Sequence, residues 1–316
     1  MLQEAAAPPA DTTLKTALFV ALGITTAWFI WAWWSLYQKR KPVVPGEKGH
    51  TWYHALVALV MCFFDTLGIG NFATTTSAFK FRNSVPDEKI PGTLNIGYAI
   101  PTVAQAFIYI SIVQVDVTTL VLMIAASVIG AWLGAGVVAK WPRRNIQIGM
   151  GLALLGAAVL MMMTALKIAP GAGEALSLQG AKLWLGLGGN FALGALMTLG
   201  IGLYGPCLIL ISLLGMSPAA AFPIMMGSCA FLMPIGGIRF VKEGSYAPWT
   251  TVVMSLAGLP AVLVAAYIVK SLALDTVRWL VVVVVIYTAA MMLRSAFTEK
   301  PAPARMPDPE ESVASN

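Results

Sequence analysis

Charged residues are scarce in this sequence of 316 residues. Asp, Glu, Lys and Arg together make up 11% of it, while 58% is hydrophobic, and soluble domains average about 25% charged residues. Uncharged stretches such as residues 252–269 are long enough to cross a bilayer, which needs about 20 apolar residues per helix. The composition therefore excludes a soluble globular domain and predicts an all-α polytopic membrane protein.

Motifs of enzyme chemistry are also absent from the sequence, which has no Walker phosphate loop, HExxH, CxxC or GxSxG. The two histidines, His50 and His54, have no sequence partner that would complete a metal site. Cys62, Cys207 and Cys229 all lie in apolar segments, so they do not indicate a disulfide framework. We predict a protein that is not an enzyme and uses no cofactor or metal.

The net charge is +6, which would suit a nucleic-acid partner if the basic residues shared one face. They lie instead in short segments between apolar runs, where Lys and Arg indicate membrane topology, because cytoplasmic loops are rich in them. We therefore predict a lipid bilayer around the protein and no nucleic-acid partner.

Nine apolar segments follow one another along the chain. Two of them, residues 54–81 and 183–214, are too long for one simple span at about 1.5 Å per residue. The first segment has no cleavage site after it, so we expect it to remain as a transmembrane helix. The segments of ordinary length are residues 16–37, 93–113, 117–139, 146–168, 218–240, 249–269 and 277–293.

The distribution of Lys and Arg indicates how the two long segments run. If every segment spans, basic loops fall on both sides and the positive-inside rule fails. If the two long segments dip in and return as re-entrant hairpins, 15 Lys and Arg fall on the cytoplasmic side and 5 on the other. This predicts seven full spans and two hairpins in the cell inner membrane, with the N-terminus outside and the C-terminus in the cytoplasm.

The turn of each predicted hairpin carries the same five letters, TLGIG. They occur at residues 66–70 and 198–202, an offset of 132 at which two prolines also match. Glycine and proline fix backbone shape, so we infer two repeats of one hairpin and three spans. Because three is odd, the second copy enters from the opposite face, as in inverted-repeat transporters. The predicted units are residues 1–50 with one extra helix, 51–168 and 182–296 as the repeats, and 297–316 as a disordered tail.

The two turns form the predicted substrate site. Irregular backbone at membrane depth is tolerated where it is buried in protein or lines a polar cavity, and a helix that starts just after such a turn offers free amides to an anion. The candidate substrate-binding residues are Gly68, Gly70, Asn71, Thr74, Thr75, Ser77, Asn95, Gln105, Gly200, Gly202, Tyr204, Gly205, Cys207, Ser228 and Cys229. The alternative for the Ser and Thr residues is that they bond only to their own backbone or to neighbouring helices.

Asp65 is the only acidic residue deep in an apolar segment. An intramembrane carboxylate is a functional candidate by default, and Asp65 could take up and release a proton during transport. The alternative is a carboxyl group that caps the tip of the hairpin by accepting amide hydrogen bonds. The sequence leaves both open.

The two turns with the residues after them, GIGNFATTTSAF and GIGLYGPCLIL, resemble the TauE/SafE family of sulfite and organosulfur anion transporters. The resemblance covers about residues 55–293 and leaves the first helix and the tail outside. It implies a secondary transporter, expected to export sulfite, sulfoacetate or another small organosulfur or carboxylate anion. The chain departs from the family's triple glycine, since Asn71 and Phe72 stand in the first copy and Leu203 and Tyr204 in the second.

The sequence is compatible with more than one mechanism of anion movement. We predict transport by alternating access with Asp65 as the candidate proton carrier. The alternatives are a passive anion channel of the same topology and a membrane sulfur-relay protein that uses Cys62, Cys207 and Cys229. The sequence does not decide the substrate, the direction of transport, the coupling ion or whether the protein forms a homo-oligomer.

Overall fold

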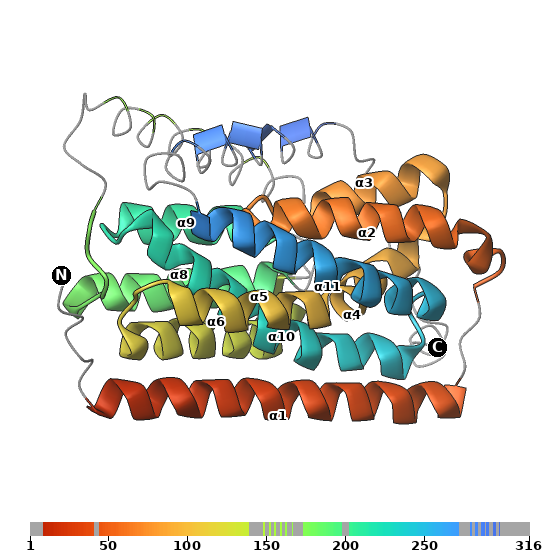
Figure 1. The fold of residues 1–316 in the computed structure, drawn as a ribbon, viewed down its shortest axis with the longest axis horizontal. Coiled ribbons are helices and arrows are strands. Elements are labelled where there is room, and N and C mark those ends of the chain that lie inside the picture. The colour runs from red at the N-terminus through yellow and green to blue at the C-terminus, as the bar shows by residue number, and fades with distance from the viewer. Residues whose placement is uncertain are drawn as a thin grey trace, which may run out of the picture.

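The computed structural model describes residues 9–40, 44–138, 173–197 and 202–271, with single positions between 148 and 166 and single positions or pairs between 279 and 297. All the elements formed by these residues are helices (Figure 1), which confirms the all-α class. Three described helices are long and apolar enough to cross a membrane, at Thr12–Lys39, Pro218–Glu243 and Pro248–Ile268. The protein is therefore a multi-pass membrane protein. The predicted spans 146–168 and 277–293 lie outside the described residues apart from the single positions.

Helix α1 (Pro9–Arg40) runs along one side of the bundle (Figure 1). It is longer at both ends than the predicted segment 16–37. Leu22 and Phe29 are fully buried against the bundle, while Trp31 and Trp34 are exposed. A helix that packs on a bundle is expected to expose large apolar side chains on its outer face when lipid surrounds it.

The first long segment folds as two helices, α2 (Thr51–Thr66) and α3 (Phe72–Arg82), joined by a turn. In that turn Gly68 has φ 95° and Gly70 has φ 80°, a left-handed conformation that glycine adopts without steric cost. The Tyr53 hydroxyl near the start of α2 donates to the carbonyl of Ala78 near the end of α3 at 2.7 Å. The two helices therefore begin and end at the same end of the bundle.

The next segment crosses the bundle as a bent pair, α4 (Ile90–Gly97) and α5 (Ala99–Ile112), with an angle of 41° between them. The sequence predicted one simple span here. Pro101 has no N–H to donate to the carbonyl of Gly97, and that carbonyl accepts a hydrogen bond from the Ser255 hydroxyl at 2.9 Å instead. A proline and an inserted side chain are the usual causes of such a kink. Helix α6 (Val117–Val138) then returns across the bundle.

The second half of the chain has helices at matching positions. They are α8 (Gly180–Met197), α9 (Tyr204–Leu213), α10 (Ala221–Glu243) after the short η3 (Pro218–Ala220), and α11 (Pro248–Ser271). The first residue of α9 follows the first residue of α3 by 132 positions, and the other bounds agree to within three residues. The packing is equivalent in the two halves as well. Helix α2 packs on α11, and its equivalent α8 packs on α6, which is the equivalent of α11. Helices α5 and α10 are also in contact.

The starts of α2, α4 and α11 lie together, at what we call the α2 end. Trp249 Nε1 donates to Thr51 Oγ1 at 2.7 Å, and the Ala247 N–H donates to Thr93 Oγ1 at 2.9 Å. The chain around α8 gathers at the other end, the α8 end, where the Leu178 N–H donates to Thr119 Oγ1 at 3.2 Å near the start of α6.

The end of α9 also lies at the α8 end, because the Ser217 N–H that follows α9 donates to the carbonyl of Ala175 at 2.9 Å. Helices α8 and α9 therefore also begin and end at one end of the bundle. The two helix pairs approach its middle from opposite ends (Figure 1).

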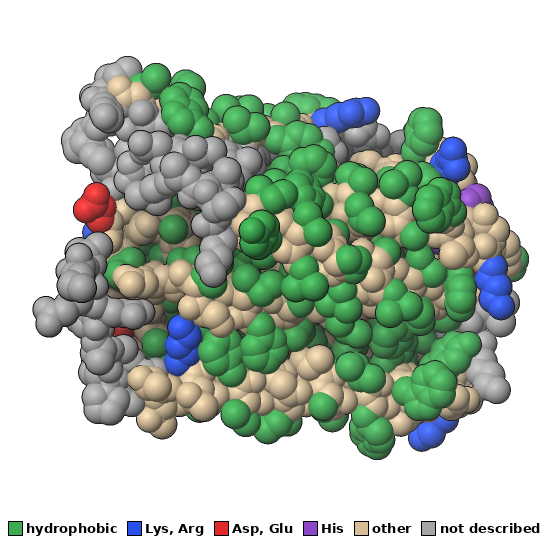
Figure 2. Space-filling model, viewed as in Figure 1, with side chains coloured by type: hydrophobic (Ala, Val, Ile, Leu, Met, Phe, Trp, Pro, Cys, Tyr) green, Lys and Arg blue, Asp and Glu red, His purple; other side chains and the backbone are tan. Residues whose placement is uncertain are grey.

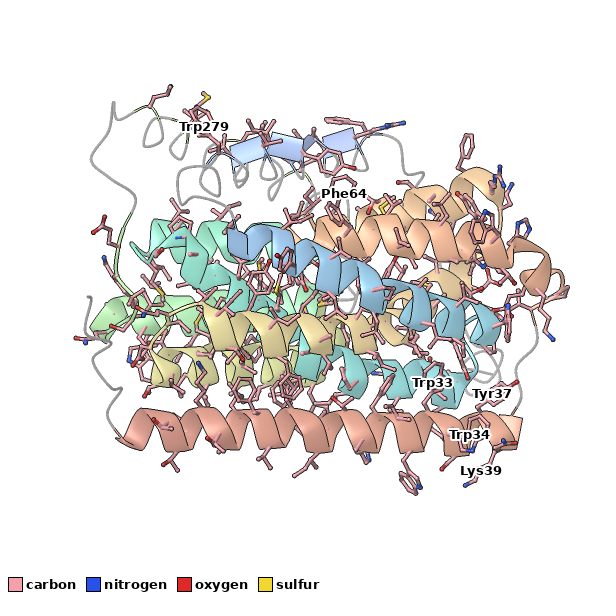
Figure 3. All side chains as sticks on the ribbon, viewed as in Figure 1. Trp33, Trp34, Tyr37, Lys39, Phe64 and Trp279 are labelled. Carbon is pink, nitrogen blue, oxygen red and sulfur yellow. The ribbon has the colours of Figure 1, made fainter. Side chains whose placement is uncertain are left out.

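The surface agrees with a bilayer environment. Figure 2 shows hydrophobic side chains over much of the visible face, with Lys and Arg mostly toward the two ends. Figure 3 shows Trp33, Trp34 and Tyr37 gathered near the last turns of α1, close to Lys39. Trp and Tyr are enriched at membrane interfaces, so this part of α1 matches one edge of a bilayer.

Helices α6 and α8 cross in direct backbone contact. A Cβ atom at Gly194 would overlap the carbonyl of Ser127, and one at Gly130 would overlap the carbonyl of Phe191. We expect Gly194→Ala to lower the free energy of unfolding by about 1 to 3 kcal/mol, because overpacking forces the helices apart. Thermal unfolding of the detergent-solubilised protein measures this.

Gly188→Ala is the matched control on the same helix, since nothing lies within 4 Å of a Cβ atom there. It should leave stability unchanged or raise it by up to about 1 kcal/mol, because alanine is the better helix former. Equal unfolding temperatures for the two variants would contradict the close crossing of α6 and α8.

Candidate functional site

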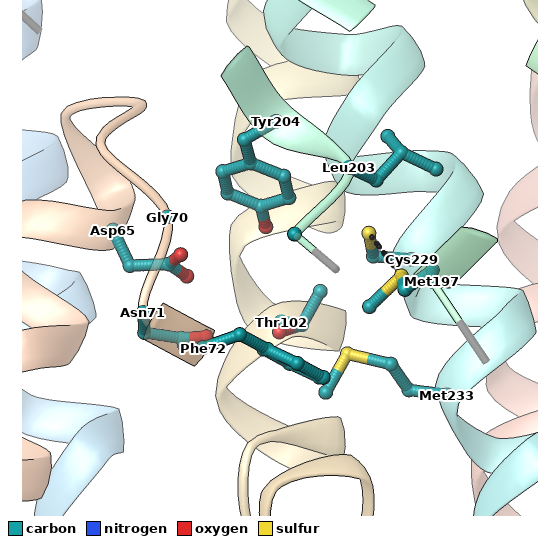
Figure 4. Close-up of a pocket in the computed structure, with 11 residues that line it drawn as sticks. Asp65, Gly70, Asn71, Phe72, Thr102, Met197, Leu203, Tyr204, Cys229 and Met233 are labelled. Atoms are coloured by element: carbon teal, nitrogen blue, oxygen red, sulfur yellow. Dashed lines mark hydrogen bonds between the residues drawn. The ribbon is translucent and has the colours of Figure 1, made fainter. Parts of the chain in front are cut away.

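A small buried cavity lies where the turns of the two helix pairs meet (Figure 4). Each of its lining side chains other than glycine is at most 5% exposed. The cavity holds about 20 Å³ of space open to water, which is room for about one water molecule. Its lining residues are Asp65, Gly70, Asn71, Phe72, Thr102, Met197, Gly202, Leu203, Tyr204, Cys229 and Met233. The space is too small for an anion, so its walls have to part before a small anion can bind there.

Two helix N-termini border the cavity. Asn71 and Leu203 are the N-cap residues of α3 and α9, and neither helix has a side-chain cap hydrogen bond. The first helical bonds run from the Thr75 N–H to the carbonyl of Asn71 and from the Cys207 N–H to the carbonyl of Leu203, both at 3.0 Å. The N–H groups before these bonds have no partner within the helix. Both helices thus direct N–H groups without a helical partner, and the positive end of their dipoles, to one place. In α9 only the residues before Pro206 can contribute such an N–H group, because proline has none.

A chain of buried hydrogen bonds joins the first helix pair to the second. The Tyr204 hydroxyl, at the start of α9, donates to Gln105 Oε1 on α5 at 2.8 Å. Gln105 Nε2 donates to Asp65 Oδ2 and to Thr66 Oγ1, each at 2.9 Å. The Tyr109 hydroxyl donates to the carbonyl of Thr66 at 2.7 Å. The end of α2 is therefore tied to α5, and through Gln105 to the opposite helix pair.

Asp65 lies beside the first turn and also lines the cavity. Its carboxyl group accepts from Gln105 at 2.9 Å and lies near the backbone N–H of Asn71, which is where the capping alternative places it. None of the lining residues is Lys, Arg or His. An anion bound here would be held by amides and hydroxyls, and a proton on Asp65 would remove the charge that repels it.

The structure brings six of the predicted site residues together at this cavity. They are Asp65, Gly70, Asn71, Gly202, Tyr204 and Cys229. Gln105 does not line the cavity but bonds to two residues that do.

Several predicted polar residues have partners elsewhere. Thr74 and Ser77 bond to carbonyls of their own helix, and Ser77 is exposed. Asn95 donates to the carbonyl of Pro91 on the same helix at 2.9 Å. The Thr75 hydroxyl bonds to the Tyr98 hydroxyl at 2.7 Å, and Ser228 accepts from Asn190 at 3.1 Å. These residues follow the alternative of local or interhelical bonding, and none lines the cavity.

The remaining predicted residues take packing positions. Gly68 allows the turn to pass close to Phe222, whose ring would lie 3.3 Å from a Cβ atom at this position. Gly205 and Cys207 are buried within α9 and do not line the cavity. Gly200 lies outside the described residues, as does most of the second TLGIG turn. Of the three cysteines, all free and buried, Cys229 alone lines the cavity, and its thiol donates to Met197 Sδ at 3.4 Å.

The sequence interpretation did not select five residues that line the cavity, namely Phe72, Thr102, Met197, Leu203 and Met233. Met197 and Leu203 stand in the second half where Asp65 and Asn71 stand in the first, so the offset of 132 pointed to them. Thr102 lies three residues before Gln105, and Met233 four residues after Cys229. Such spacings put side chains on one helix face.

Within the part of the chain that the structure describes, no group of three or more His, Cys, Asp or Glu side chains could hold a metal ion. A search of curated proteins and a search of solved structures gave no match. The family model described as sulfite exporter TauE/SafE matches residues 5–162, half of the chain. The match contains α1, so the sequence interpretation was wrong to leave the first helix outside the resemblance, and it ends before α8. The chain therefore belongs to the sulfite exporter TauE/SafE family, whose members are transporters rather than enzymes.

Proposed function

We propose that this protein is a secondary transporter that moves a small organosulfur or carboxylate anion across the cell inner membrane, in the outward direction. One observation carries the proposal. Two helix N-termini without a side-chain cap hydrogen bond, from helix pairs that enter from opposite ends of the bundle, border one small buried cavity. Helix N-termini attract anions, and the absence of a lining Lys, Arg or His lets the site release its ligand as a carrier must.

The two helix pairs are proposed to be re-entrant hairpins in an inverted repeat. Three features support this: the matching helix bounds at an offset of 132, the packing of α2 on α11 and of α8 on α6, and the return of each pair to the end where it began. Inverted repeats place the substrate site at their shared interface near the middle of the bilayer. The cavity lies at that interface.

The α2 end is proposed to face the cytoplasm. Basic residues at this end of the described chain outnumber those at the α8 end, where Lys15 and Lys182 lie. By the positive-inside rule the richer end is cytoplasmic, which places the start of α1 on the outer side. The basic residues of the α2 end are Lys39, Lys48, Lys80, Arg82, Lys89, Arg239 and Lys242.

Alternating access follows from two equivalent hairpins around one site. If each hairpin closes the cavity toward its own end, opening either one exposes the anion to one side of the membrane. A passive channel has less support, because every non-glycine lining side chain is nearly inaccessible here. A sulfur relay has less support too, because Cys62 and Cys207 do not line the cavity.

Uptake into proteoliposomes tests the proposal. Labelled sulfite, sulfoacetate and short sulfonates would be offered to the reconstituted full-length protein, with and without a pH gradient. We expect saturable uptake of at least one of them, and accumulation when the gradient is imposed. No movement above that of empty liposomes would refute the transporter, while flux that neither saturates nor accumulates would show a channel.

A further inference from the structure

The first helix pair exposes large aromatic side chains at the α2 end of the bundle. Trp52, in the first turn of α2, is 82% exposed, and Phe81, in the last turn of α3, is 86% exposed. Arg82 directly follows Phe81 and is exposed as well. Exposed rings beside Lys and Arg are typical of the edge of a bilayer, where the headgroups of the lipids lie.

Two basic side chains near Trp52 lie over aromatic rings. The Arg82 guanidinium carbon is 4.7 Å from the centroid of the Tyr53 ring, and Lys48 Nζ is 5.5 Å from the centroid of the Trp249 ring. Both distances are within the about 6 Å at which the face of a ring attracts a cation. The rings hold these long side chains in place before a ligand arrives, so binding costs less conformational entropy.

The geometry of α2 places Trp52 between the two cations. Consecutive helical residues point about 100° apart around the axis, so the side chain of Trp52 projects between those of Thr51 and Tyr53. Thr51 Oγ1 accepts from Trp249 Nε1 at 2.7 Å, which holds the ring below Lys48, while Tyr53 is the ring below Arg82. We call this set the basic aromatic face, formed by Lys48, Trp52, Tyr53, Arg82 and Trp249.

The two cations of the basic aromatic face are not neutralised by a carboxylate. Within the described residues neither Lys48 nor Arg82 forms a salt bridge. Glu47 precedes Lys48 but is buried, and its Oε1 atom accepts from the Thr250 N–H instead. A guanidinium group that stacks on a ring keeps the N–H groups at its edge available, and these match two oxygens of a phosphate. The face therefore combines positive charge with donors suited to a phosphate group.

We propose that the basic aromatic face binds the headgroups of anionic phospholipids, with Lys48 and Arg82 as the phosphate ligands and the Trp52 ring between them. The bilayer around a multi-pass membrane protein supplies this ligand at high concentration. Basic clusters at the ends of membrane segments attract anionic lipids, and a Trp ring suits the boundary between headgroups and acyl chains. This inference goes beyond transport and does not depend on the anion site.

A lipid bound at this face would connect three helix ends. Lys48 lies just before α2, Arg82 ends α3, and Trp249 lies in the first turn of α11. Phosphate contacts to both cations would therefore hold the base of the first helix pair against the start of α11. A ligand that binds the folded protein and not the unfolded one raises the unfolding temperature, so anionic lipid should stabilise the protein.

Lipid binding to the detergent-solubilised full-length protein tests the proposal. Phosphatidylglycerol and phosphatidylcholine with the same acyl chains would be titrated, with bound lipid counted by native mass spectrometry and the unfolding temperature followed in parallel. We expect the wild type to bind phosphatidylglycerol about 25-fold more tightly than phosphatidylcholine, about fivefold for each cation. Phosphatidylglycerol should also raise the unfolding temperature more. This comparison needs no variant.

Charge-removing variants test the face itself. Lys48→Gln and Arg82→Gln should each lower the preference for phosphatidylglycerol about fivefold, and the double variant should lose it. Both side chains are exposed, so the variants should fold. Lys242→Gln is the matched control, since Lys242 is exposed at the same end and lies over no ring of the described chain. It should keep the preference of the wild type.

Three outcomes would overturn the proposal. Equal affinity of the wild type for the two lipids would remove the lipid site, whatever the variants do. A loss of preference in Lys242→Gln as large as in Arg82→Gln would show that the general positive charge of the α2 end attracts the lipid. Displacement of phosphatidylglycerol by an equal concentration of inorganic phosphate would assign the face to a soluble ligand. None of these outcomes bears on transport, which the uptake experiment tests separately.

Discussion

Asp65→Asn is expected to abolish proton-driven accumulation of substrate while the protein stays folded. The asparagine oxygen can still accept from Gln105, as the Asp65 carboxyl group does, but the amide cannot carry a proton. With one proton moved per anion, a gradient of one pH unit drives about tenfold accumulation. In the variant we expect the inside and outside concentrations to become equal.

The measurement is uptake of labelled sulfite into proteoliposomes with an acidic outside and an alkaline inside. Protons load Asp65 from the acidic side and enter together with the anion, so accumulation should grow with the gradient in the wild type only. In the cell the same coupling moves the anion outward when its concentration inside is high enough to outweigh the proton gradient. Asp116→Asn is the matched control. Asp116 caps the start of α6 by accepting from the Thr119 N–H at 2.7 Å, does not line the cavity, and should keep its gradient dependence. If Asp65→Asn still accumulates sulfite, Asp65 is not the proton carrier and its role is limited to the structure of the turn.

The second large effect is expected at the bond between Gln105 and Tyr204. Tyr204→Phe leaves Gln105 Oε1 buried without its donor, which should lower the free energy of unfolding by about 1 to 3 kcal/mol. Gln105→Leu should lower it at least as much, because Tyr204 loses its acceptor and Asp65 and Thr66 each lose a donor. Chemical unfolding in detergent measures both.

The double variant tests whether the two residues act as a unit. Once Gln105 is leucine, the Tyr204 hydroxyl has lost this partner and its removal should be nearly neutral. The double variant should therefore be more stable than the sum of the single effects predicts, by about 1 to 2 kcal/mol. Additive effects would show that the hydrogen bond between Tyr204 and Gln105 does not contribute to the free energy of unfolding.

Helix class and the position of the first break were predictable because they depend on local chemistry. Low charge and long apolar segments require helices in a membrane, and the glycines of TLGIG mark where α2 stops. The bend between α4 and α5 was not predicted, although Pro101 is a visible signal. Its cause also includes Ser255, which lies 158 residues after Gly97, and no local pattern shows which side chain will reach a freed carbonyl.

The site was partly predictable for a related reason. Asp65, Asn71 and Tyr204 adjoin the turns, so locating the turns located them. Ser77 and Asn95 were selected because they are polar, but polar side chains in helices commonly bond to the carbonyl one turn back, and both do. Met197 and Leu203 also line the cavity, but their apolar side chains carry no sequence signal of an anion site.

A disulfide across the two turns tests the central claim most directly, that hairpins from opposite ends of the bundle meet at one point. A Cβ atom at Gly70 would lie 3.9 Å from Tyr204 Cβ, close to the separation of about 3.8 Å found in disulfides. We would combine Gly70→Cys and Tyr204→Cys in a protein whose three native cysteines are replaced by alanine, with Gly70→Cys and Leu213→Cys as the control pair. After mild oxidation in membranes, mass spectrometry should find the two peptides linked in the first protein and separate in the second. Because the left-handed backbone at Gly70 strains a cysteine, the first protein must also unfold at the same temperature as the control pair. Absence of the link in a first protein that folds would contradict the account.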